Sequence, residues 1–200
     1  MCDNRLTEED VKTFLLNAYF GDVSEDPIYV AANAAYLDLS RTIEFKTTPS
    51  ITEEKKAELR QWSVDKIKAS VIELYEIKDL DSEKFDDWHT ILCDALKKHY
   101  NENTVQFHYG QAQKWVNMTM KYLSVIDLNV TAPYFAYLHV PVDYIVIDLA
   151  SEELGLQRPQ SRWSRMERSE YVEFQKALCN AIREQNNLAP LLWEFRYWNR

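Results

Sequence analysis

Glycine is scarce in this 200-residue chain, which contains only three. Strands, hairpins and tight loops usually depend on glycine, because it adopts backbone conformations that other residues avoid. The shortage therefore favours helices joined by short connections. At 46% hydrophobic residues the chain still carries enough apolar side chains for a sizeable core. We expect one compact all-α, multi-helix domain over residues 1–200, with two helical lobes around a cleft as the alternative arrangement.

Cysteine is also rare, and long apolar runs are missing. Cys2, Cys93 and Cys179 are too few and too widely spaced for a disulfide framework or a cysteine-based metal site. Cys93 and Cys179 fall in apolar helical patterns and are predicted to be buried free thiols in a reducing compartment. The chain has no run of about 18 apolar residues, so no membrane span is predicted. Its polar start does not resemble a secretory signal. We expect a cytoplasmic protein without membrane contact, cofactor or metal.

Basic residues are fewer than acidic ones: the chain has 23 Lys and Arg residues and 32 Asp and Glu residues. A net charge of -9 argues against a broad surface that coats nucleic acid. One basic cluster stands out at Arg158, Arg162, Arg165 and Arg168. It predicts either phosphate contacts or an exposed helix start balanced by Glu167 and Glu170.

Helix signals are frequent along the whole chain. Thr7 begins a capping box, Pro27 suits a first helical turn, and Thr104 can cap the helix that follows it. Gly21 and Gly155 are predicted to end helices. Residues 47–50 are predicted to be a loop, and 126–138 a connection with one helical turn. Apolar periodicity predicts helices at about 7–20, from Pro27, 52–77, 82–100, from Tyr109, 141–153, 164–186 and from Pro190.

Two of these helices carry the residues that hint at chemistry. The central helix, from Tyr109 to Leu123, has Lys114 near its start. Gly110 is unfavourable inside a helix, so it indicates either a turn before the helix or a close approach of another backbone. Pro141 is predicted to open the later helix, with Asp143 in its first turn.

The segment Gly110-Gln111-Ala112-Gln113-Lys114, followed by Pro141-Val142-Asp143-Tyr144, resembles the helix-hairpin-helix DNA glycosylase superfamily. The Gln-Lys pair, with Lys121 seven positions after the first lysine, is most similar to the archaeal 8-oxoguanine DNA glycosylase branch. Ala112 stands where the superfamily has its second hairpin glycine. The resemblance covers about residues 109–156.

The resemblance implies a DNA base-excision glycosylase, with AP-lyase activity as a further expectation and damaged DNA as its partner. Lys114 would be the nucleophile and Asp143 its acid–base partner, with Lys121 as the second candidate amine. Backbone groups of the hairpin would contact DNA together with three arginines of the basic cluster. The implied nucleic-acid contacts are Gly110, Gln111, Gln113, Arg158, Arg162 and Arg165.

An alternative of a different class also fits the sequence. The chain would then be a catalytically inactive helical binding or regulatory protein of a bacterial or phage family, with a protein partner. Lys114 would be a solvated lysine, and Asp143 a helix-terminal acid that complements the helix dipole. His108 and His139 each precede a predicted helix and could line one pocket, but no metal site is predicted from them.

Overall fold

The computed structural model describes residues 5–24, 26–45 and 51–198, and these residues are helical almost throughout. Apart from a single bridge between Glu44 and Gln106, they form no β-structure, which confirms the all-α prediction. The predictions for Cys2 and for residues 47–50 lie outside the described residues. The α-helices in the described part are α1 (Glu8–Phe20), α2 (Pro27–Leu39), α3 (Glu53–Glu76), α4 (Ser82–Glu102), α5 (Tyr109–Ile126), α6 (Leu128–Thr131), α7 (Tyr144–Leu154), α8 (Arg168–Asn186) and α9 (Pro190–Tyr197).

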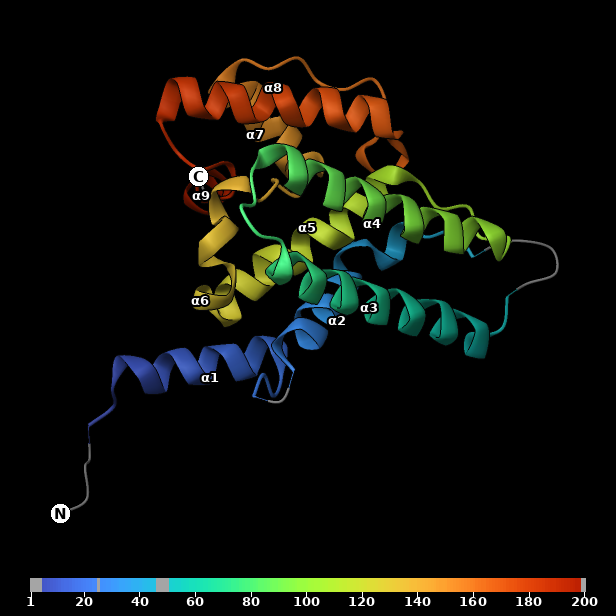
Figure 1. The fold of residues 1–200 in the computed structure, drawn as a ribbon, viewed down its shortest axis with the longest axis horizontal. Coiled ribbons are helices and arrows are strands. Elements are labelled where there is room, and N and C mark those ends of the chain that lie inside the picture. The colour runs from blue at the N-terminus through green and yellow to red at the C-terminus, as the bar shows by residue number, and fades with distance from the viewer. Residues whose placement is uncertain (1–4, 25, 46–50, 199–200) are drawn as a thin grey trace.

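Helix α5 runs through the middle of the molecule (Figure 1), where it contacts α2, α4, α6 and α8. Every residue from Tyr109 to Ser124 is buried, including its lysines, glutamines and asparagine. Polar groups removed from water need partners inside the protein. The fold supplies a hydrogen bond or an ion pair for each of these lysines and glutamines and for the asparagine.

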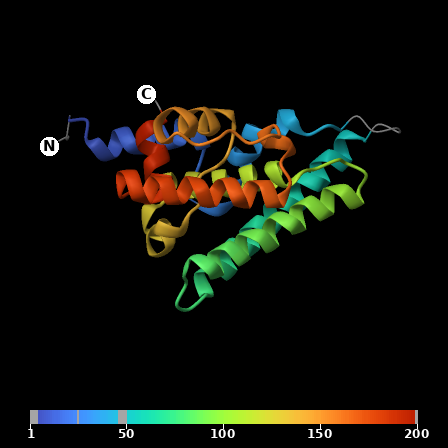
Figure 2. The same ribbon diagram turned by 90° about the horizontal axis from the view of Figure 1, so that it is seen from above.

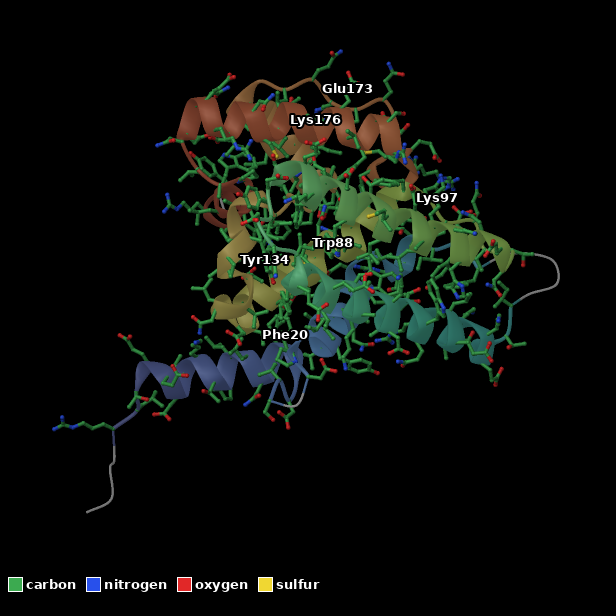
Figure 3. All side chains as sticks on the ribbon, in the orientation of Figure 1. Phe20, Trp88, Lys97, Tyr134, Glu173 and Lys176 are labelled. Carbon is green, nitrogen blue, oxygen red and sulfur yellow. The ribbon has the colours of Figure 1, made fainter. Side chains whose placement is uncertain are left out.

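The other helices surround α5 unequally. Helices α3 and α4 form a pair on one side, and α8 crosses on another, packed against α7 and α9 (Figures 1 and 2). Helix α1 extends away from the body with its side chains largely free (Figure 3), and none of its residues is buried. Among the described residues, no helix has the length and apolar character needed to span a membrane.

Several helix boundaries follow from local chemistry, as predicted. The Thr7 side chain accepts a hydrogen bond from the Asp10 N–H, and the Asp10 carboxylate accepts one from the Thr7 N–H. These two bonds complete the capping box. Gly21 ends α1, and Pro27 is the first residue of α2. Gly155 ends α7 in the left-handed region at φ 68°, a conformation that glycine adopts at little cost.

Other boundaries were predicted wrongly, because neighbouring segments decide them. His108, and not Thr104, caps α5; Thr104 lies in the connection with a positive φ of 61°. Helix α7 begins at Tyr144 with Asp143 as its N-cap, so Pro141 precedes the helix instead of opening it.

Two further predictions are corrected downstream of α5. The predicted helix at 164–186 begins only at Arg168, after a 3-10 turn, η3 (Trp163–Arg165). The connection at 126–138 holds α6 and a second 3-10 segment, η2 (Ala132–Tyr137), so it is more helical than predicted.

Candidate functional site

Lys114 and Asp143 form a buried ion pair between α5 and the start of α7. The Lys114 Nζ lies 2.6 Å from Asp143 Oδ2, and the two side chains are only 4% and 9% exposed. Asp143 Oδ1 accepts a hydrogen bond from the Val146 backbone N–H at 3.0 Å, as expected of an N-cap. One carboxylate oxygen therefore holds the helix, while the other holds the amine, and the positive end of the helix dipole favours the negative charge.

Gln113, the neighbour of Lys114, fixes the segment that precedes Asp143. Its Nε2 donates to the carbonyls of Val142 at 2.7 Å and Gly110 at 2.9 Å. Its Oε1 accepts from the Val142 N–H at 3.2 Å. The side chain is fully buried, and both ends of its amide are bonded within the protein. Gln113 thus positions Asp143, and no part of it faces a nucleic acid in this conformation.

Gly110 and Gln111, which were predicted to contact DNA, also lie inside the fold. The Gly110 N–H donates to the Met166 carbonyl at 3.0 Å, so it is not free for a phosphate. A Cβ atom on Gly110 would lie 1.8 Å from the Trp163 carbonyl oxygen. Of the two interpretations of this glycine, the close backbone approach is therefore confirmed. The Gln111 side chain donates to the Thr42 carbonyl at 2.7 Å and joins α5 to the 3-10 turn η1 (Ser40–Thr42) that follows α2.

Lys121 has a carboxylate partner of its own. Its Nζ lies 2.6 Å from Glu194 Oε1 and 4.1 Å from the centre of the Trp198 ring. Glu194 is fully buried. Burial raises the pKa of Glu194 above its usual value, although the charge of Lys121 opposes that shift. The two lysines of α5 are therefore held by different acids.

Two of the predicted arginines line a pocket together with aromatic side chains. Arg158 and Arg162 line a pocket of about 450 Å³ together with Tyr144 and Trp163. Tyr144 directly follows Asp143 in the chain. Trp163 lies over Gly110, and Gly110 precedes Lys114 by one helical turn on the same face of α5. Neither Lys114 nor Asp143 lines the pocket; Tyr144 is the lining residue that follows Asp143 in the chain.

Arg165 is separated from that pocket. Its guanidinium pairs with Glu44, while Arg158 pairs with Asp148. Both pairs are exposed, so each contributes little to stability and could exchange for a phosphate.

A hydrogen-bonded chain that the sequence did not predict reaches Gln113 from the opposite side. His139 Nε2 donates to Asp86 Oδ1 at 2.7 Å. The Tyr171 hydroxyl accepts from Asn117 Nδ2 at 2.9 Å, so its own proton points to His139 Nδ1 at 3.0 Å. Asn117 Nδ2 also donates to Gln113 Oε1 at 3.0 Å. A chain of hydrogen bonds therefore runs from Asp86 at the surface to Gln113, which in turn is hydrogen-bonded to the Val142 backbone.

His108 and His139 do not line one pocket, so that expectation is wrong. His139 lies instead against His89, with ring centres 4.6 Å apart, while His108 caps α5 and contacts Glu167. The segments carrying His89 and His139 are far apart in sequence, so no local pattern brings them together. The only signal was the presence of polar residues on apolar helix faces, at His89 and Asn117.

His89 should make the protein less stable in acid. It is fully buried, and burial first, then the neighbouring His139, lowers its pKa well below 6.5. Below pH 6.5 the unfolded chain therefore binds a proton that the folded chain does not. The free energy of unfolding falls as the pH falls, with a slope that approaches about 1.4 kcal/mol per pH unit near pH 5. Urea unfolding between pH 7 and pH 5 measures this slope. His89→Gln keeps an N–H for Asn117 Oδ1 and should flatten it; equal slopes in both proteins would contradict the assignment.

No group of three or more His, Cys, Asp or Glu side chains in the described ranges is placed to hold a metal ion. Compared with known proteins, the chain matches no family model, no curated protein and no solved structure. A proposal for its function therefore depends on the geometry of its own residues.

Proposed function

We propose that this protein is a divergent DNA base-excision glycosylase with AP-lyase activity, related to the helix-hairpin-helix superfamily, in which Lys114 is the nucleophile and Asp143 its acid–base partner. The observation that supports this most is the buried contact of 2.6 Å between Lys114 Nζ and Asp143 Oδ2. An amine beside a carboxylate, shielded from water, is the arrangement that Schiff-base chemistry on a sugar needs. The pocket that Tyr144 lines adds aromatic rings and arginines suited to an unpaired nucleotide.

In the proposed reaction, Asp143 first accepts a proton from Lys114 and later donates a proton to the departing base. A proton passes from Lys114 Nζ to Asp143, and the free amine then attacks C1′ of the sugar. The bond between C1′ and the base nitrogen breaks, its electron pair leaves with the base, and the base takes the proton back from Asp143. Asp143 passes a proton from Nζ to the ring oxygen O4′, and opening of the sugar ring gives the Schiff base. Asp143, again a carboxylate, takes the C2′ proton as the bond from C3′ to the 3′ phosphate breaks, and water releases the lysine.

Access is the structural requirement that this chemistry adds. Little of either side chain is exposed, so the sugar reaches Nζ only after the surrounding side chains move. We expect Tyr144 to be the side chain that moves to admit the sugar, because it is 65% exposed and directly follows Asp143.

Borohydride trapping on duplex DNA with an abasic site or 8-oxoguanine tests the proposal. We expect a covalent adduct with the wild type and none with Lys114→Arg, because a guanidinium cannot form the Schiff base. Lys121→Arg is the matched control on the same helix and should retain the adduct. Asp143→Asn should slow adduct formation by about 10²-fold or more, as expected when a proton-transfer partner is lost. An adduct lost only in Lys121→Arg would reassign the nucleophile.

The second candidate is a binding or regulatory protein without catalysis, and one observation favours it. Helix α1 has no buried residue, yet Phe14, Leu15 and Tyr19 are each more than half exposed, at 70%, 59% and 66%. Apolar side chains gathered on one exposed helix are typical of a partner-binding surface. If the wild type gives no adduct and releases no base from damaged DNA, this second function replaces the first.

A further inference from the structure

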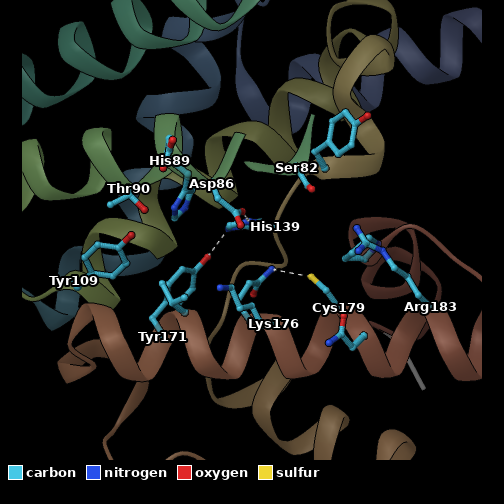
Figure 4. A pocket seen from close by; sticks show the side chains of 16 residues that line it. Ser82, Asp86, His89, Thr90, Tyr109, His139, Tyr171, Lys176, Cys179 and Arg183 are labelled. Carbon is cyan, nitrogen blue, oxygen red and sulfur yellow. Dashed lines mark hydrogen bonds and ion pairs between the residues drawn. The ribbon is translucent and has the colours of Figure 1, made fainter. Parts of the chain in front are cut away.

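A second cavity lies between α4 and α8, away from the Lys114–Asp143 pair. It has a volume of about 240 Å³, and His139, Tyr171 and Gln175 are among the residues that line it (Figure 4). Gln175 is only 3% exposed, and its Oε1 has no hydrogen-bond partner. Buried polar atoms are nearly always hydrogen-bonded. Oε1 itself has almost no accessible surface, so a ligand with an N–H or O–H donor reaches this unpaired acceptor when the Gln175 side chain turns toward the cavity.

The two walls of this cavity carry opposite charges. Asp86 and Asp87 come from α4, while Lys176 and Arg183 come from α8. Lys176 and Arg183 are seven residues apart, so they lie on the same face of α8. Within the described ranges, no ion pair joins either of them to the acids across the cavity: Asp86 pairs with His139, and Asp87, Lys176 and Arg183 enter no ion pair. The cavity thus separates unpaired charges of opposite sign.

We propose that this cavity binds a small zwitterion with the chemistry of a free amino acid. Its carboxylate is met by Lys176 and Arg183, and its ammonium group by Asp87 and the Oε1 of Gln175. Only a ligand with both charges satisfies both walls and the buried acceptor. The volume of about 240 Å³ equals roughly eight waters in the liquid, which suits a molecule of that size. The proposal does not depend on Lys114 or on DNA.

The test uses the purified full chain and a panel of free L-amino acids. Thermal shift identifies those that raise the melting temperature, and calorimetric titration measures their dissociation constants. We expect at least one to bind, and its N-acetyl and carboxamide derivatives to bind about tenfold more weakly or worse, because each loses a charge-assisted hydrogen bond. If no amino acid binds at millimolar concentration, or if the neutralised derivatives bind equally well, the proposal is wrong.

Variants place the ligand in this cavity. Arg183→Met and Lys176→Met change exposed positions and should fold normally while weakening binding about tenfold each. Gln175→Leu removes the buried acceptor at similar volume and should weaken binding at least as much. Lys78→Met removes an exposed lysine outside the cavity and should leave the dissociation constant unchanged. Wild-type affinity in Arg183→Met and Gln175→Leu would overturn the assignment.

Discussion

Replacing Gly110 with alanine should lower the free energy of unfolding by about 3 kcal/mol or more. The new Cβ would lie 1.8 Å from the Trp163 carbonyl oxygen, and the atoms behind it are also backbone, at Trp163 and Met166. A backbone cannot rotate aside as a long side chain can. The segment would have to move away from α5, breaking the hydrogen bond from the Gly110 N–H to Met166.

Urea unfolding measures this change in the free energy of unfolding, and its sign decides between two expectations. Helix propensity alone predicts the opposite, since alanine favours a helix over glycine by about 1 kcal/mol. Gly155→Ala is the control: nothing lies within 4 Å of its Cβ position, but its φ is +68° in the left-handed region, so it should lose only about 1–2 kcal/mol. A Gly110→Ala protein as stable as the wild type would show that the Trp163 segment does not press on α5.

The parts of the fold that the sequence predicted are those that local chemistry determines. Thr7 and Asp10 satisfy the first turn of α1 by themselves, and Pro27 and Gly155 fix backbone angles where they stand. Such signals act within about four residues, so no other segment is needed to interpret them.

The site could be predicted only in part, because its geometry depends on distant segments. The sequence singled out Lys114 and Asp143, and the fold pairs them across 29 positions. The alternative of a solvated Lys114 is contradicted, since the side chain is buried. No pattern near Gly110 could tell that the Trp163 segment lies against it. Nor could spacing show that Gln113 faces Val142 instead of a phosphate.

Lys121→Met should cost about 3–5 kcal/mol of unfolding free energy, while the double variant Lys121→Met, Glu194→Leu should return to within about 1 kcal/mol of the wild type. The single change leaves the fully buried Glu194 without its cation, and Glu194 Oε2 already lacks a hydrogen bond. Replacing both partners removes the buried charge together with its need for a partner. Lys55→Met breaks an exposed pair and is the control, with an expected change below about 0.5 kcal/mol.

The pH dependence of Lys121→Met separates lost charge pairing from lost packing. Without the lysine, the pKa of Glu194 rises further above its usual value, so the folded state binds a proton that the unfolded state does not. Stability then falls as the pH rises above the unfolded value of about 4.3. His89 contributes the same pH dependence to the wild type and to the variant, so it cancels in their difference. The difference in unfolding free energy between the two proteins should therefore be smaller at pH 5 than at pH 7.

A loss that is the same at pH 5 and pH 7, or additive losses in the double variant, would mean that Lys121 acts through packing alone. A coupled, pH-dependent loss would identify Lys121 as a structural cation and leave Lys114 as the amine available for chemistry.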